Sequence, residues 1–359
     1  MAGPIIGIHA SHEQFRPDRL LDLMQRAEAA GFDSGMCSDH WAPWSQEQGQ
    51  SGFAWSWLGA ALATTSMPFG VVNAPGQRYH PTIIAQAAAT LATMFPDRFW
   101  IAVGSGQLLN EHITGDRWPA KVERNKRLRE AADVMRRLWA GETVTHQGHV
   151  RTSEATLWTR PERPPLLVGA AVTPPTAAWV AEWADALITV SQADEQLDAV
   201  IGAFRSNGGD GKPMFLQAHL AYAPSEEEAR VAAFAQWRQN TLPNAVMTDL
   251  AHPEQIAAAA THVTHDDLDD AVRRARRTAL SIGPYRSPSA AMWTDEPTRS
   301  ANSSVSCPVG SLGRSCPSMN PTGTMPWRFA AFSRRVRARS RAVSSSKRTR
   351  LNRASALRT

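Results

Sequence analysis

Residues 69–103, FGVVNAPGQRYHPTIIAQAAATLATMFPDRFWIAV, contain the pattern that determines the fold. The apolar stretch 69–73 predicts a buried strand, residues 81–94 predict a helix that begins at a proline, and residues 99–103 predict a second strand. Two strands joined by a helix of this length run parallel. The segment therefore predicts a β-α-β unit of a parallel α/β fold.

The same alternation extends in both directions along the chain. Strands are predicted at residues 5–8, 34–38, 69–73, 99–103, 166–168, 186–190 and 214–222. Each is followed by a predicted helix, at residues 20–30, 53–63, 81–94, 121–139, 176–184, 195–205 and 225–238. An open sheet would show the same alternation, but closure in eight units is the commonest outcome at this chain length. We therefore expect an α/β fold of the TIM-type (β/α)8 barrel class.

Two segments depart from the alternation. Residues 141–161 predict an inserted hairpin, with Gln147 and Gly148 at its turn. After an acidic helix at 266–272 the chain becomes rich in Arg, Ser and Pro, and no clean strand and helix of an eighth unit follow. We expect a barrel domain at residues 1–275 and a basic tail at residues 276–359, which is disordered or results from a shifted reading frame.

The net charge of +5 is distributed unevenly along the 359 residues. Residues 297–359 contain 13 basic and no acidic side chains, which leaves 25 basic against 33 acidic ones in residues 1–296, a net of −8. An acidic body argues against nucleic acid as a partner of the barrel. A disordered basic tail would still bind nucleic acid or anionic lipid nonspecifically.

Cysteine usage and hydropathy bear on the compartment. The three cysteines show no metal-ligand spacing, the first residues lack a signal-peptide core, and no apolar run is long enough to cross a bilayer. We therefore expect a cytoplasmic protein that does not enter the membrane.

Reactive groups of a parallel barrel gather just after the C-terminal ends of the strands. The strand 34–38 is followed by Asp39, His40, Trp41 and Trp44. A carboxylate, an imidazole and two indoles can hold a planar cofactor and move a proton, because imidazole titrates near neutrality and indoles stack on flat rings. The alternative is a loop histidine that lies beside core tryptophans without a chemical role.

Two further turns have a composition suited to a ligand. Residues 104–112, GSGQLLNEH, let the backbone approach a ligand closely, and Asn110 offers a donor and an acceptor to a heteroaromatic edge. Residues 169–176, GAAVTPPT, precede a helix, where free backbone N–H groups can meet a phosphate. Ordinary turn chemistry explains either stretch equally well when it is taken alone.

Several dispersed segments closely resemble the luciferase-like superfamily, over about residues 5–272. They are residues 38–44, 77–81 with 84–87, 103–115 and 127–141. Within the superfamily they look like the branch that contains the glucose-6-phosphate dehydrogenases dependent on the deazaflavin coenzyme F420, together with relatives that use an ordinary flavin. The resemblance implies a barrel with a flavin-type cofactor at its mouth.

The resemblance also implies roles for individual residues. His40 would be the proton donor or acceptor beside the cofactor ring. In this superfamily the third strand often carries a bulge with a non-proline cis peptide, which persists only where the site holds it in place. Substrate would contact Trp44, Val190 and Ser191. The cofactor would contact Asp39, Val72, Asn73, Ala74, Ser105, Gly106, Asn110, Gly169, Ala170, Ala171 and Val172.

The chain departs from this branch at two places. Gln107 stands where the dehydrogenases have a glutamate that works as an acid or base, and an amide cannot replace it in that role. Glu111 is the nearby carboxylate that could substitute. The lysines that grip the sugar phosphate are absent from residues 191–193 and 257–260. These departures argue against glucose 6-phosphate and favour FMN over coenzyme F420.

We therefore expect a flavin-dependent oxidoreductase or monooxygenase, with FMN favoured, that acts on a small organic substrate and draws on a flavin reductase for reduced flavin. A coenzyme F420-dependent dehydrogenase is the first alternative. A second is an inactive or misfolded barrel without its eighth unit, and a third is a metal-dependent hydrolase that uses His9, His12 and Glu13. Helix faces rich in Ala and Trp would suit a homodimer.

Overall fold

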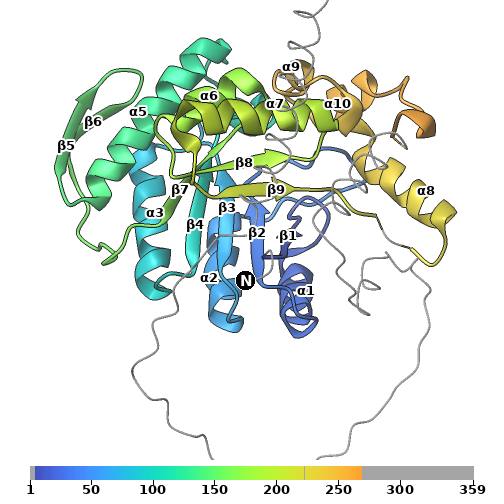
Figure 1. The fold of residues 1–359 in the computed structure, drawn as a ribbon, viewed down its shortest axis with the longest axis horizontal. Coiled ribbons are helices and arrows are strands. Elements are labelled where there is room, and N and C mark those ends of the chain that lie inside the picture. The colour runs from blue at the N-terminus through green and yellow to red at the C-terminus, as the bar shows by residue number, and fades with distance from the viewer. Residues whose placement is uncertain (1–4, 222, 269–359) are drawn as a thin grey trace, which may run out of the picture. The chain divides into compact units, whose positions relative to one another are not determined.

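The computed structural model describes residues 5–221 and 223–268. Their seven parallel strands form one sheet in the order β1-β2-β3-β4-β7-β8-β9, and Figure 1 shows this sheet curving into a nearly closed barrel. The fold is thus the predicted TIM-type barrel. The strands are β1 (Gly7–Ala10), β2 (Ser34–Ser38), β3 (Phe69–Asn73), β4 (Phe99–Val103), β7 (Leu166–Ala170), β8 (Ala186–Val190) and β9 (Met214–Gln217).

A helix follows each strand and covers the outside of the sheet (Figure 1). The long helices are α1 (Pro17–Ala29), α2 (Ala54–Thr64), α3 (Pro81–Met94), α5 (Lys121–Trp139), α6 (Pro174–Ala181), α7 (Asp194–Phe204) and α8 (Glu226–Trp237). Short helices that were not predicted are α4 (Leu108–Glu111), α9 (Asn244–Met247) and α10 (Pro253–Ala259). Several one-turn segments accompany them: η1 (His112–Thr114), η2 (Arg205–Gly209) and η3 (Arg238–Thr241).

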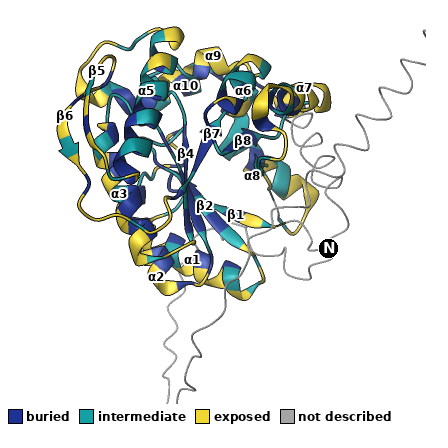
Figure 2. Cartoon of the chain, turned by 60° about the vertical axis from the view of Figure 1, so that its left-hand side comes forward, coloured by how far each residue is buried: buried dark blue, intermediate teal, exposed yellow. Residues whose placement is uncertain are grey.

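The interior of the barrel is filled by apolar side chains from strands far apart in sequence. Ala102, Val168 and Ile188 are buried there. Trp100 from β4 stacks on Phe215 from β9, with their ring centroids 4.6 Å apart. Figure 2 shows the strands as a buried centre with exposed residues on the outer faces of the helices. This packing explains why the strands read as nearly continuous apolar runs.

The insertion between α5 and β7 is the predicted hairpin. Strands β5 (Thr143–Gln147) and β6 (Arg151–Thr156) pair antiparallel, and β5 packs against α5. Its turn lies at residues 148–150, slightly later than predicted, where the Gly148 amide donates to the Val150 carbonyl.

The described sheet has two edge strands, β1 and β9. The segments that follow these two edge strands lie close together at the mouth of the barrel. Gln14, after β1, donates a hydrogen bond to Gln236 at the end of α8 over 2.9 Å. The expected eighth unit and the basic tail at residues 276–359 lie outside the described residues, and so does the predicted boundary at residue 275.

The expectation of a cis peptide in the third strand is wrong, since every peptide bond in the described residues is trans. Strand β3 keeps a regular parallel ladder with β4 through Asn73, and the Gly104 amide continues it by donating to the Asn73 carbonyl over 3.0 Å. No helix within residues 5–221 and 223–268 is long and apolar enough to cross a membrane.

Candidate active site

A histidine and a glutamate form the central pair at the C-terminal ends of β1 and β2. His40 Nδ1 lies 2.6 Å from Glu13 Oε1. The Ser11 hydroxyl donates to the other carboxylate oxygen, Glu13 Oε2, over 2.8 Å. The His40 side chain is 13% exposed and that of Glu13 only 3%. Since Glu13 occupies Nδ1, the second ring nitrogen of His40 is the one left for a substrate.

The carboxylate of this pair is held in its charged form. Burial acts to raise the pKa of Glu13. The charge of His40, the hydrogen bond from His40 and the charge of His9 together outweigh burial and lower this pKa to about 2. Glu13 therefore stays ionised near neutral pH. A fixed negative charge at Nδ1 orients the imidazole, as the carboxylate of a catalytic triad does.

A second buried network lies on the ends of β2 and β3. Asp39 Oδ2 accepts hydrogen bonds from Asn73 Nδ2 over 2.8 Å and from Trp55 Nε1 over 3.1 Å. Arg78 Nη2 lies 3.4 Å from the same oxygen and donates to the Asp39 carbonyl over 2.6 Å. The Arg78 amide donates to Glu111 Oε2 over 2.7 Å. Arg78 therefore joins the β2 and β3 ends to α4.

Both carboxyl groups of this network are easier to protonate than usual. Burial raises the pKa of Asp39 although Arg78 opposes it, and burial likewise raises the pKa of Glu111. Asp39 Oδ1 and Asn73 Oδ1 are buried and have no hydrogen-bond partner among the described residues. Such buried acceptors are expected to meet donors from a ligand.

The loop after β4 brings small residues and α4 to the same mouth. Gly106 has φ +81°, and a side chain there would meet Glu111, Ala74 and Trp118. Asn110 is committed to the protein, because its Oδ1 accepts from the Trp41 amide over 2.9 Å. Its Nδ2 faces Gln107 Oε1 at 3.4 Å.

The turn after β7 offers fewer phosphate donors than its sequence suggested. The Ala171 amide already donates to the Ile188 carbonyl over 3.0 Å, and the first two residues of α6 are prolines without an N–H. Gly169 faces outward, because a side chain there would meet Val180 of α6. The amides of Val172, Thr173 and Thr176 are what remains for an anion. Ala170 lies beside this turn at the end of β7.

The wall of the mouth around Trp44 is apolar. Trp44 contacts the edge of the His40 ring, with ring centroids 4.9 Å apart. It packs with a cluster of α4, α9 and α10 residues that includes Leu109, Met247 and Ile256. Residues 239–268, which contain α9 and α10, include no Lys or Arg. This segment itself therefore contributes no basic side chain to the wall around Trp44.

The predicted site residues gather at this one end of the barrel, where parallel strands end together. Asp39 contacts Asn73, and Arg78 links Asp39 to Glu111, while His40 contacts Glu13. Val72 and Ala74 flank Asn73 at the end of β3. Val190 ends β8, and the Ser191 amide donates to the Gln217 carbonyl over 2.7 Å. Ser105, after β4, receives a contact from Lys121 at 2.5 Å.

The sequence analysis missed two central side chains. Glu13 was considered only as a metal ligand, and within the described residues no group of three ligating side chains suited to a metal forms. Arg78 belonged to a recognised segment but had no role assigned to it. The rule that strand ends share one edge could have placed Glu13 beside His40. No sequence signal ties Arg78 to Asp39.

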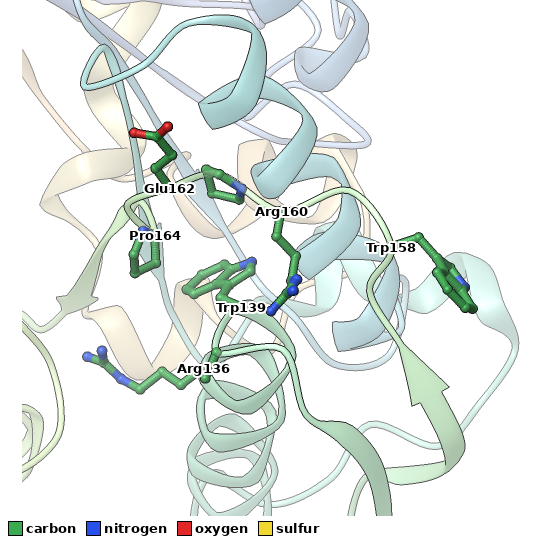
Figure 3. A pocket seen from close by; sticks show the side chains of 8 residues that line it. Arg136, Trp139, Trp158, Arg160, Glu162 and Pro164 are labelled. Atoms are coloured by element: carbon green, nitrogen blue, oxygen red, sulfur yellow. The ribbon is translucent and has the colours of Figure 1, made fainter.

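One surface cavity lies away from this mouth. It has a volume of about 590 Å³ and lies between the C-terminal end of α5 and the connection that enters β7. Figure 3 shows Arg160 alongside Trp139 and Trp158 pointing away from them. Because β7 begins beside it, this cavity lies at the N-terminal end of the strands, where barrel enzymes do not place their active sites.

Comparison with known proteins supports the family assignment. Residues 5–290 match the luciferase-like monooxygenase family. The chain is 35% identical over 294 residues, 76% of this chain and 87% of the relative, to an F420-dependent glucose-6-phosphate dehydrogenase of Microbacterium testaceum (strain StLB037). It is 36% identical over 263 residues, 71% of each protein, to an F420-dependent hydroxymycolic acid dehydrogenase of Mycobacterium tuberculosis.

A solved structure has the same fold. An F420-dependent secondary alcohol dehydrogenase, in complex with an F420-acetone adduct, superposes with a TM-score of 0.71 at 29% identity, covering 79% of this chain and 91% of that one. The chain belongs to the luciferase-like monooxygenase family.

Proposed function

We propose that this member of the luciferase-like family is a deazaflavin-dependent dehydrogenase that interconverts an apolar secondary alcohol and its ketone. The two curated relatives and the solved structure all use coenzyme F420, and two of the three names specify an alcohol or hydroxy acid as substrate. These relatives favour the deazaflavin as the cofactor, whereas the departures of the sequence from the dehydrogenase branch had favoured FMN. The observation that carries the proposal is the buried His40–Glu13 pair beside an apolar wall.

The mouth fits a flat heteroaromatic cofactor. Asp39 Oδ1 and Asn73 Oδ1 are buried acceptors without a protein donor in the described part of the chain, and a deazaflavin offers ring N–H and ribityl hydroxyl donors. Gly106, with φ +81°, lets the backbone approach closely. Asp39, Asn73 and Gly106 would therefore hold the cofactor. Once bound, the deazaflavin supplies a carbon that accepts a hydride from the substrate.

His40 is suited to handle the accompanying proton. As hydride leaves the alcohol carbon, the hydroxyl proton must go to a base, and the free ring nitrogen of His40 is available to take it. Glu13 then faces a positively charged imidazole at 2.6 Å, which stabilises the protonated state. In the reverse direction His40 returns the proton to the ketone oxygen.

The apolar wall defines the substrate class. Trp44 and the cluster around Leu109 and Met247 present hydrocarbon surface, and residues 239–268 supply no cation for a phosphate. An uncharged alcohol with an alkyl or aryl group would bury that surface favourably. A sugar phosphate would lose its hydration without gaining an ion pair.

Parallel titrations test the proposal. Purified protein is titrated with coenzyme F420 and with FMN, and the retained cofactor is then tested for reduction by 2-propanol, by longer secondary alcohols and by glucose 6-phosphate. We expect F420 to bind and the longer alcohols to reduce it. Exclusive retention of FMN, or reduction by glucose 6-phosphate alone, would overturn the proposal. Failure to bind either cofactor would instead indicate an inactive barrel.

A further inference from the structure

We propose that His219 binds a second, uncharged oxygen of the substrate. The substrates would then be secondary alcohols that also contain an ether, ketone or hydroxyl oxygen. This inference rests on the proposed function and narrows its substrate class. His219 lies two residues after Gln217, the last residue of β9, and so belongs to the end of the barrel that carries the site.

A chain of contacts connects His219 to the substrate wall around Trp44. The Trp44 amide donates to Gln48 Oε1 over 2.9 Å, and Gln48 Nε2 donates to the Gln236 carbonyl over 3.2 Å. The His219 ring packs on Trp237, the next residue of α8, with ring centroids 4.7 Å apart. The wall that begins at Trp44 therefore continues to His219.

The apolar cluster of the wall reaches His219 through a second contact. Leu242 packs on the cluster that includes Leu109 and Met247. Asn240, two residues before Leu242, lies in η3 with its Nδ2 3.2 Å from His219 Nε2. A substrate whose hydrocarbon chain covers this cluster would therefore meet a polar group where the apolar surface ends.

His219 also lies near the groups around the proton-transfer pair. The charge of His9 acts on both His219 and Glu13, so His9 lies within electrostatic range of the two. His9 Nε2 is 3.2 Å from Ser38 Oγ, at the end of β2 and two residues before His40. One substrate molecule would thus extend from His40 to His219.

The contact with Asn240 determines what His219 offers to a ligand. An amide nitrogen only donates, so His219 Nε2 accepts from Asn240 and the ring proton lies on Nδ1. Within residues 5–221 and 223–268 this Nδ1 has no hydrogen-bond acceptor. His219 therefore offers one N–H, which suits an oxygen acceptor of the substrate.

The ring is uncharged at neutral pH, which disfavours an ionised substrate group. Burial and the charge of His9 lower the pKa of His219 from 6.5 to about 4. Arg238, in the same turn as Asn240, is already paired with Glu47 at 3.1 Å. A carboxylate would lose more hydration here than the neutral ring returns, whereas an ether, ketone or hydroxyl oxygen needs only the N–H.

The test uses pairs of secondary alcohols that differ in one group. One member has an alkyl chain, and the other has an ether oxygen in place of one methylene, at increasing distance from the carbinol carbon. An ether oxygen only accepts, so it reports on the Nδ1 proton. We would measure kcat and KM with protein loaded with coenzyme F420. Calorimetry would give the dissociation constants of the matching ketones without turnover.

Two variants and one control separate binding from folding. His219→Leu removes the N–H, and His219→Gln keeps an amide N–H in a side chain of similar reach. The matched control is His265→Leu, which also removes a histidine stacked on α8, where the rings of His265 and Phe234 lie 4.0 Å apart.

We expect the unmodified chain to prefer the ether at one chain length by about fivefold in KM and in the dissociation constant of the ketone, with kcat within about twofold. An alkyl chain would leave the N–H unpaired. His219→Leu should erase this preference and still oxidise the alkyl alcohols, His219→Gln should restore part of it, and His265→Leu should keep it.

Three outcomes would overturn the role of His219. They are no ether preference in the unmodified chain, the same preference in His219→Leu, and equal loss of both members of each pair in His219→Leu and His219→Gln, which would show that the ring only supports the wall. Failure of every alcohol to reduce the cofactor would overturn the proposed function instead.

Discussion

Two acidic sites lie side by side at the barrel mouth, and the pKa values of their carboxyl groups are shifted in opposite directions. Glu13 is buried, yet its partner His40 and the charge of His9 lower its pKa to about 2 against the effect of burial. Asp39 and Glu111 are also buried, but burial dominates there and raises the pKa of both although Arg78 contacts each of them. The same residue types therefore have opposite protonation tendencies within one mouth.

The difference follows from what surrounds each carboxylate. Glu13 faces a side chain that is 13% exposed and can exchange a proton with the mouth. Asp39 faces Arg78, which is 6% exposed and also anchors the backbone of β2. The first site is built to move a proton, and the second is built to hold the strand ends and the cofactor pocket in place.

The largest effect should come from removing the base of the first site. Replacement of His40 by alanine would leave Glu13 buried without its partner, so His40→Gln is the cleaner change, because an amide N–H can still face the carboxylate. We expect turnover to fall by about 10²–10⁴-fold, with cofactor affinity within about threefold. Steady-state kinetics and cofactor fluorescence check both numbers.

Glu13→Gln is the companion variant. It keeps the shape of the pair and removes its fixed charge, so turnover should fall less than in His40→Gln, by about tenfold, and the rate should change its dependence on pH. Full activity in both variants would show that the pair is structural. Loss of cofactor binding in both would show that the two sites at the mouth are not separable.

A change in the second site should mainly lower the stability of the fold. Arg78→Met removes the cation that contacts the Asp39 carboxylate and donates to the Asp39 carbonyl, leaving buried acceptors uncompensated, while the backbone amide of residue 78 can still donate to Glu111. We expect the free energy of unfolding to fall by about 3–5 kcal/mol, measured by urea denaturation. Arg129→Met, at an exposed pair on α5, is the control and should change it by less than about 1 kcal/mol. If Arg78→Met leaves stability unchanged and only slows turnover, Arg78 acts in the reaction and not in holding the fold.

Much of this fold could be predicted because its signals are local. Strands β2, β3, β4 and β8 and helices α3 and α5 have the predicted bounds, and local signals such as Pro68 before β3, Pro81 at the start of α3 and Gly104 after β4 mark several of their ends. Helices α4, α9 and α10 were missed. They have four to seven residues, too few for a helical period to appear in the sequence.

The site could be predicted only as far as the rule for strand ends reaches. That rule brought His40, Asn73 and Glu111 to one mouth. It could not show that Asn110 is bonded to the Trp41 amide, that Gly169 faces α6, or that Arg78 joins two carboxylates. Each of these depends on the direction of a side chain, which is set by tertiary packing and not by spacing along the chain.

The smallest effect concerns a histidine beside the first site that is not part of the pair. His12 is fully buried, its ring lies 4.8 Å from Trp57 in an edge-on contact, and neither ring nitrogen has a hydrogen-bond partner among the described residues. Burial lowers the pKa of His12 from 6.5 to about 4, although the charge of Glu13 acts to raise it. The charge of Glu13 therefore does not outweigh the effect of burial on His12.

A pH titration of stability tests this division. Above pH 6.5 His12 is neutral in the folded and the unfolded chain and has no effect. As pH falls from 6.5 to about 4, the unfolded chain takes up a proton that the folded chain refuses, so His12 should remove up to about 3 kcal/mol of stability. His12→Leu should flatten the decline of the melting temperature over this range. If the melting temperatures of His12→Leu and the unmodified chain decline in parallel, burial does not keep His12 neutral. Glu13 would then interact equally with His12 and His40, and the contrast between the His40–Glu13 pair and its surroundings would be wrong.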